Sequence, residues 1–87
     1  GITMQYSITE ENKNETDKTE KETGKINLVR NIEEQYNKRI YHLPSGTKQT
    51  ILIDIRGQKI SQQNLSIVYN EIMRCTNNGV TVIFKSN

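Results

Sequence analysis

The chain has 87 residues, of which 32% are hydrophobic, with a mean hydropathy of -0.77 and a formal net charge of +2. This length indicates one small domain, whose core must come from a few well-patterned segments. The single cysteine excludes an internal disulfide framework and a zinc site built from cysteines, and no segment reaches the ~18 apolar residues of a membrane helix. Because the N-terminus lacks a signal-peptide pattern and starts with Gly1, we expect a soluble, processed piece of a larger protein.

The charge is unevenly distributed along the chain. Residues 1–25 carry six acidic and four basic side chains, a net of −2, whereas residues 26–87 carry eight basic and four acidic ones, a net of +4. A basic body with an acidic arm fits a polyanionic partner, although ordinary surface charge explains the same counts equally well. We therefore divide the chain into an N-terminal strand with a charged arm, 1–25, and a basic domain, 26–87.

The first third of the chain contains one alternating segment and one helical segment. ITMQYSI alternates apolar and polar residues, which predicts a half-buried strand near residues 2–8. Residues 9–25 have no apolar side chain and predict a linker, a long loop or a solvated helix, with a functional acidic arm as the alternative. Apolar side chains then recur at helical spacing and predict a helix near residues 27–38.

The remaining residues alternate between strand and helix patterns. RIYHL predicts a short strand near residues 39–43, which the turn residues of PSG would end. TILIDI, rich in β-branched residues, predicts the strongest strand, near residues 50–55. Apolar side chains at helical spacing predict a second helix near residues 61–76, and VTVIFK predicts a last strand near residues 80–85.

Together these elements predict an α+β domain with a small mixed four-stranded sheet and two helices. Residues 44–49 would form a hairpin that pairs strands 39–43 and 50–55 antiparallel. The second helix would cross over so that strands 50–55 and 80–85 lie parallel, through the usual right-handed connection. The carboxyl ends of these two strands would then share one edge, where open sheets bind ligands.

Polar side chains follow the two parallel strands at that edge. Those side chains are Asp54, Arg56, Gln58 and Lys85. Such a cluster beside a helix N-terminus suits a phosphate group. Alternatively, Asp54 and Arg56 simply pair with sheet neighbours such as Arg39.

Histidine is the side-chain type whose ordinary pKa suits proton transfer near neutral pH, and His42 is the only histidine of the chain. A single surface histidine is more often incidental, but HLPSGTK surrounds this one with hydroxyl groups, a glycine turn and a lysine. RNA can be cleaved without a metal when a base deprotonates the 2′-hydroxyl group and a cation stabilises the phosphorane. The candidate catalytic residues are therefore His42, Lys48 and Arg56, and the candidate substrate-binding residues are Thr47, Asp54, Gln58 and Lys85.

The predicted hairpin creates a geometric difficulty for this set. It would put His42 opposite Ile51, about five residues from Arg56, and at ~3.3 Å per residue this is too far for one proton-transfer site. Either His42 leaves the strand for the loop, or only one of the two groups is catalytic.

The segment HLPSGTKQTILIDIRGQ, with the following helix and VTVIFK, resembles the C-terminal toxin domains of polymorphic bacterial toxins. The closest group in type is the contact-dependent growth inhibition effectors, CdiA, and the resemblance covers roughly residues 26–87. It implies a secreted or cell-surface effector domain that is delivered into the cytoplasm of a neighbouring bacterium and is blocked by a cognate immunity protein. Most such domains are nucleases, and many of them cleave tRNA. The resemblance leaves open which bond is cut and whether elongation factor Tu is required. We expect no cofactor and no stable membrane association.

Two nuclease architectures occur among such toxins. One is the metal-independent fold of barnase, colicin D and RelE-like toxins, and the other is the metal-dependent PD-(D/E)xK fold, in which an aspartate precedes an E-x-K strand. The order strand, helix, strand with an Arg-Gly pair is similar to the second. However, the first strand has Gln5-Tyr6-Ser7 where E-x-K would be expected, and Glu11-Asn12-Lys13 lies in the segment without apolar residues.

We therefore expect the metal-independent fold and a ribonuclease that cleaves tRNA, without a metal site. The alternatives are a metal-dependent nuclease of the PD-(D/E)xK type and a non-catalytic protein-binding remnant of such a toxin. A basic cleft is most simply blocked by an acidic protein, so we expect the immunity protein to contact Lys48, Arg56 and Lys85.

Overall fold

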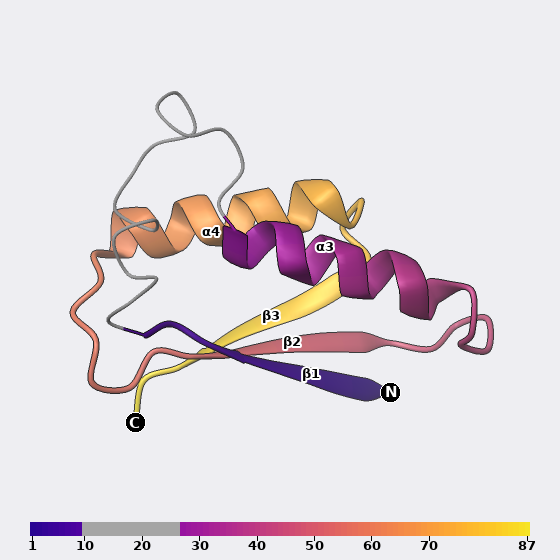
Figure 1. The fold of residues 1–87 in the computed structure, drawn as a ribbon, viewed down its shortest axis with the longest axis horizontal. Helices are drawn as coiled ribbons and strands as arrows, with labels where there is room; N and C mark the ends of the chain where they lie inside the picture. Colours follow the sequence, from indigo (N-terminus) through magenta and orange to yellow (C-terminus); the bar gives the residue numbers. More distant parts are fainter. Residues whose placement is uncertain (10–26) are drawn as a thin grey trace.

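The computed structural model describes residues 1–9 and 27–87, and its elements follow one another as strand, helix, strand, helix, strand (Figure 1). The elements are β1 (Ile2–Ser7), α3 (Asn27–Ile40), β2 (Gln49–Asp54), α4 (Gln62–Cys75) and β3 (Val80–Lys85). Within the described residues, the strands form one three-stranded sheet in the order β1-β2-β3, and β2 pairs parallel with both neighbours. None of the helices in these two ranges has the length and apolar character needed to cross a membrane.

The predicted four-stranded mixed sheet is wrong. Residues 39–43, predicted as a strand, instead complete α3 and the turn after it, where the His42 N–H donates to the Arg39 carbonyl oxygen at 2.9 Å. The predicted antiparallel hairpin across residues 44–49 is therefore absent, and β2 takes β1 as its parallel neighbour instead. The prediction of a barnase, colicin D or RelE-like fold depended on this mixed sheet and is therefore wrong as well.

Other parts of the sequence-based fold are confirmed. Strands lie near residues 2–8, 50–55 and 80–85, a helix lies near residues 61–76, and the last two strands pair parallel as predicted. The broader prediction of an α+β domain is consistent with these elements. β1 belongs to the same sheet as the elements of residues 26–87, whereas the charged arm from residue 10 onward lies outside the described residues.

Both helices lie along the same side of the sheet, as Figure 1 shows. This agrees with the strand order β1-β2-β3, because crossover connections of the same hand that step in the same direction across a parallel sheet place their helices on the same face. The core fills the space between this face and the helices. Its buried apolar side chains are Met4, Ile8, Leu28, Val29, Ile32, Ile51, Ile53, Ile55, Leu65, Val68, Ile72 and Val80.

The other side of the sheet is covered by neither helix, and we call it the open face. Side chains alternate along a strand, so the residues between the core positions point to this side. The open face comprises Thr3, Gln5, Ser7, Thr50, Leu52, Asp54, Thr81, Ile83 and Lys85. Its most apolar exposed member, Ile83, is 48% exposed.

The turns at the two ends of β2 have the same construction. Before the strand, the Thr47 N–H donates to the Pro44 carbonyl oxygen at 3.1 Å, and Gly46 has a φ of 85°. After it, the Gln58 N–H donates to the Ile55 carbonyl oxygen at 3.0 Å, and Gly57 has a φ of 80°. Each glycine occupies the third position of a type II turn, where a positive φ is required. The central strand is therefore closed at both ends by glycine-dependent turns.

The ends of α4 follow from its flanking polar residues. The Ser61 side chain accepts a hydrogen bond from the Asn64 N–H at 3.1 Å and caps the first turn. At the other end, the Asn78 N–H donates to the Met73 carbonyl oxygen, and the Asn77 N–H donates to that of Arg74. This is the Schellman pattern, with Asn77 in the left-handed conformation at a φ of 53°. The helix therefore ends where the NNG sequence predicts.

Candidate functional site

The structure places the predicted site residues in two groups at opposite ends of β2. The amino-end group contains His42, Thr47 and Lys48, and the carboxyl-end group contains Asp54, Arg56, Gln58 and Lys85. Because β2 has six residues, its ends are roughly 20 Å apart. Proton transfer requires groups within hydrogen-bond reach of the reacting atoms. His42 and Arg56 therefore cannot serve one reaction centre in this conformation.

Local sequence builds the centre of the carboxyl-end group. The Arg56 N–H donates to Asp54 Oδ1 at 2.9 Å, which forms an Asx turn directly after β2. The guanidinium donates through Nε to both carboxylate oxygens at 3.1 Å and through Nη2 to Oδ2 at 2.8 Å. Asp54 pairs in register with Lys85 of β3. The D-x-R spacing thus fixes the direction of the arginine, and the parallel register brings Lys85 to the same edge.

The charges of this group act on one another. Hydrogen bonds from the Arg56 side chain and then from its backbone N–H lower the pKa of Asp54 from its ordinary value of 3.8 to about 2, and the positive charge of Lys85 acts in the same direction. The carboxylate in turn raises the pKa of Arg56. Both partners of this ion pair are therefore ionised at neutral pH.

The lowered pKa of Asp54 predicts a pH dependence of stability. Between about pH 4 and about pH 2, Asp54 is protonated in the unfolded chain but still ionised in the folded chain. Its contribution to the free energy of unfolding is therefore fully present above this pH range and is lost as the pH falls through it. We expect the difference in urea midpoint between the parent protein and Asp54→Asn to be constant above pH 5 and to vanish near pH 2. Far-UV circular dichroism at each pH measures it. A difference that does not change with pH would contradict the Asp54–Arg56 ion pair.

A hollow of about 380 Å³ adjoins the Asp54–Arg56 ion pair and opens on the open face. Its walls are formed by Gln5, Tyr6, Ser7, Leu52, Asp54, Arg56 and Lys85. The bonds to Asp54 use Nε and Nη2 of the guanidinium and do not use Nη1. Charge-assisted hydrogen bonds from an arginine fork and a lysine are the contacts that phosphate oxygens prefer. This hollow therefore offers charged hydrogen-bond donors that suit a phosphate group.

Gln58, predicted as part of the same group, does not line this hollow. Its N–H closes the turn after β2. Its Oε1 is buried and has no hydrogen-bond partner in the described part of the chain. Its position indicates a role in the turn rather than in this hollow.

The amino-end group is arranged by the loop between α3 and β2. His42 is exposed in the turn after α3. The Thr47 hydroxyl donates to the Pro44 carbonyl oxygen at 2.7 Å and thereby strengthens the turn before β2. The Lys48 carbonyl accepts from the Ile2 N–H at 3.0 Å, which starts the β1–β2 pairing. The Thr47 hydroxyl and the Lys48 carbonyl thus both stabilise the backbone at this end of the sheet.

Sequence reasoning missed Gln49 at the same end. Its side chain is only 5% exposed, and its Oε1 has no hydrogen-bond partner in residues 1–9 and 27–87. It occupies the first inward position of the alternation that continues at Ile51 and Ile53. A polar residue at an apolar position of this alternation was the available signal.

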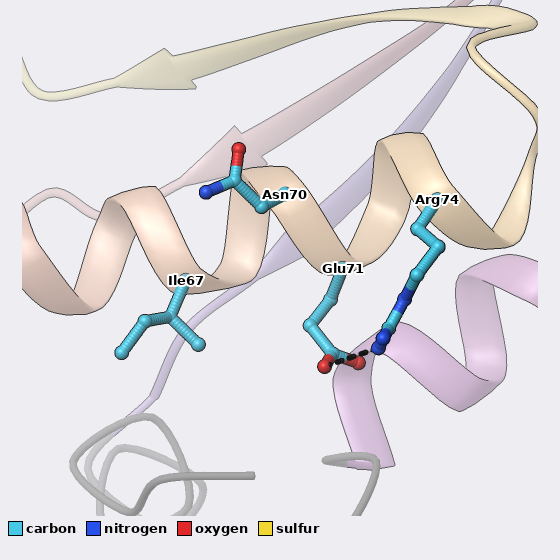
Figure 2. Close-up of a pocket in the computed structure, with 4 residues that line it drawn as sticks. All are labelled: Ile67, Asn70, Glu71 and Arg74. Atoms are coloured by element: carbon cyan, nitrogen blue, oxygen red, sulfur yellow. Dashed lines mark hydrogen bonds and ion pairs between the residues drawn. The ribbon is translucent and has the colours of Figure 1, made fainter.

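A smaller hollow of about 200 Å³ lies along α4 (Figure 2). Its walls are formed by Ile67, Asn70, Glu71 and Arg74. Arg74 Nη2 donates to Glu71 Oε1 at 2.7 Å, and the Glu71 side chain is 4% exposed. A carboxylate that binds an arginine one helical turn away is most simply a structural ion pair. We therefore place no reaction there.

The described residues contain no group of three or more histidine, cysteine, aspartate or glutamate side chains arranged to hold a metal ion. Glu11 and Lys13, which have the E-x-K spacing, lie outside the described residues. Comparisons of the chain with protein-family models, with curated proteins and with solved structures found no match.

Proposed function

We propose that this chain is an antibacterial toxin domain that acts as a metal-independent ribonuclease on tRNA. The observation that carries the proposal is the carboxyl-end group, in which an arginine fixed by its Asx turn lies beside a lysine at the edge where parallel strands bind ligands. The resemblance of HLPSGTKQTILIDIRGQ to toxin domains of contact-dependent growth inhibition effectors gives the biological class.

The separation of the two groups assigns their roles in this proposal. Arg56 and Lys85 bind the scissile phosphate and stabilise the charge of the phosphorane, and Asp54 holds Arg56 in place. His42 and Lys48, roughly 20 Å away along β2, contact a more distant part of the RNA. The 2′-hydroxyl that attacks the phosphate would then lose its proton to water, and the 5′-oxygen that leaves the phosphorus would take up a proton from water.

A second candidate is a non-catalytic remnant of such a toxin, which binds its partner without cleaving it. The observation that favours this candidate is the position of the histidine, because His42 lies at the opposite end of β2 from Arg56. In the described part of the chain, the hollow at the carboxyl end is lined by an arginine and a lysine and by no histidine. Such cations are sufficient for binding but supply only part of the catalysis.

The purified full chain should be incubated with total tRNA in EDTA and, separately, in magnesium, and the products separated on a denaturing gel. Cleavage in EDTA is the expected result. Cleavage that requires magnesium would favour the metal-dependent alternative, and a bound but intact tRNA would favour the non-catalytic remnant. The absence of both binding and cleavage would overturn the proposal. The same assay with and without elongation factor Tu decides whether that protein is needed.

We also propose a cognate immunity protein with an acidic surface that covers the carboxyl-end group, in the cytoplasm of the target bacterium. Arg56 and Lys85 lie close enough for one small contact surface. Lys48 lies at the other end of β2, so a partner that contacts all three residues must follow the whole length of the sheet. Such a partner would cover the open face.

A further inference from the structure

We propose that the amino end of the sheet contains a nucleobase-binding subsite centred on Gln49, which selects a base that carries an amino group. The inference rests on the proposed RNA substrate and adds the part of the molecule that would distinguish one sequence from another. Phosphate contacts position a nucleic acid, whereas base contacts specify it.

Two adjoining hollows of about 430 Å³ and 300 Å³ lie at this end of the sheet. They share Gly46, Thr47, Gln49 and Gly79 in their walls. The larger hollow lies between the C-terminal part of α3 and the loop before β2, and the smaller one extends around the sheet end to Thr81 on the open face. Together they form one depression that links the helix side with the open face.

Gln49 gives this depression its polar group. The residue is only 5% exposed, and Oε1 lacks a hydrogen-bond partner throughout the described part of the chain. A buried carbonyl oxygen without a donor costs free energy, so native structures rarely keep one unless a ligand or water satisfies it. Gln49 lines both hollows, and a turn of its side-chain amide toward them would bring the buried Oε1 within reach of a donor on a bound molecule.

The walls around Gln49 suit the flat faces of a base. The larger hollow is lined by the aromatic side chain of Tyr36 and by three apolar side chains, which are Ile40, Leu43 and Pro44. Gly79 allows the close approach of Tyr36, because a Cβ at this glycine would lie 2.5 Å from the tyrosine hydroxyl oxygen and 2.8 Å from the Thr76 carbonyl oxygen. The tyrosine is therefore held against the strand end, and aromatic side chains are the usual stacking partners of unpaired bases.

The missing donor points to the class of base. Adenine, cytosine and guanine each present an exocyclic amino group that can donate to a glutamine carbonyl, whereas uracil has no amino group and presents carbonyl oxygens beside its single N–H. We therefore expect a base with an amino group at this position rather than uracil.

The open face connects this subsite with the carboxyl-end group. Thr81 at the smaller hollow, Ile83 and Lys85 follow one another along the open side of β3. A single strand of a few nucleotides that crosses this face would place one base near Gln49 and a phosphate near Arg56 and Lys85. In this arrangement the bound RNA extends over the roughly 20 Å that separate the two ends of β2.

The test uses the purified full chain and short, fluorescently labelled oligomers of A, C and U with 2′-O-methyl groups, which block cleavage through the 2′-hydroxyl. Fluorescence anisotropy should show that A and C oligomers bind about tenfold more tightly than the U oligomer. Gln49→Leu and Gln49→Met should weaken A and C binding to the level of U. The matched control Gln63→Leu, an exposed glutamine on α4, should leave all three affinities unchanged.

The thermal midpoints of the same variants check a purely structural role. Gln49→Met removes the unpartnered carbonyl and should raise the midpoint, whereas a glutamine kept for stability would make the midpoint fall. As a measurement that needs no variant, adenosine should shift the backbone amide resonances of Gln49 and Gly79 more than uridine does.

The outcomes separate this inference from the proposed function. Equal binding of all three oligomers, or a base preference that survives both Gln49 substitutions, would overturn the subsite while leaving the RNA-binding proposal intact. No measurable binding of any oligomer or of tRNA would overturn both.

Discussion

Arg56→Ala is expected to lower the rate of tRNA cleavage by about 10²–10³-fold, the usual effect of removing one charge-stabilising donor from an active site. The substitution removes the guanidinium fork beside the Asp54 carboxylate and leaves Lys85 as the other cation among the described residues that line this hollow. Folding should be retained, because the Arg56 side chain is 52% exposed and the turn depends on backbone bonds and on Gly57. Single-turnover cleavage of purified tRNA in EDTA measures the effect.

Three further variants make this result specific. Arg56→Lys should recover only part of the rate, because an ammonium group cannot reproduce a bidentate fork. Arg39→Ala makes the same change of charge at the exposed end of α3 and should change the rate only a few-fold. His42→Ala should have an equally small effect. A loss of 10² or more in His42→Ala would show that the RNA complex brings the two ends of β2 together, against the placement of the reaction at Arg56.

Ile53→Ala is expected to destabilise the fold by about 2–5 kcal/mol, the range for truncation of a buried isoleucine. Ile53 is 0% exposed and lies in β2, between both neighbouring strands and below the helices. A small domain has a free energy of unfolding near the lower end of about 5–15 kcal/mol, so this loss is a large share of the total. Urea denaturation followed by far-UV circular dichroism should show a lower midpoint with an unchanged slope.

Ile83→Ala is the matched control for this measurement. It removes the same atoms from the open face of β3, where the side chain is 48% exposed, and should cost less than about 1 kcal/mol. A similar loss in both variants would mean that the open face is buried in solution, for example against a second copy of the chain. The two variants together therefore test which face of the sheet forms the core.

The sequence predicted most elements correctly because their patterns are local. Period-two alternation marked β1, and the β-branched run marked β2. The strand predicted for RIYHL was wrong because a pattern of five residues cannot distinguish a short strand from the last turn of a helix. Ile40 also continues the helical spacing of Tyr36. The PSG turn was correctly identified as a turn, but a turn alone does not decide whether a strand or a helix precedes it.

Strand pairing and the position of a hollow could be predicted from the sequence only where a single crossover connection determines them. The parallel pairing of β2 with β3 followed from a single crossover helix, and it brought Asp54, Arg56 and Lys85 to one edge as predicted. The pairing of β1 with β2 depends on partners far apart in the chain, for which the sequence contains no local signal. The depression around Gln49 needs the end of α3, a loop and Gly79 together, so no single segment indicates it.

The central place of β2 also determines how the sheet assembles in time. Gln49 aligns with Ile2, 47 positions away (49 − 2), and with Val80, 31 positions away (80 − 49). The entropic cost of closing the longer loop is only about 0.4 kcal/mol greater than that of closing the shorter one. Loop closure therefore does not strongly favour the formation of one pairing before the other. Non-local parallel pairing is intrinsically slow, and in the described chain neither edge strand has a partner other than β2. The described strands form no hairpin on which the sheet could nucleate, so we expect them to gain or lose their order in one cooperative transition.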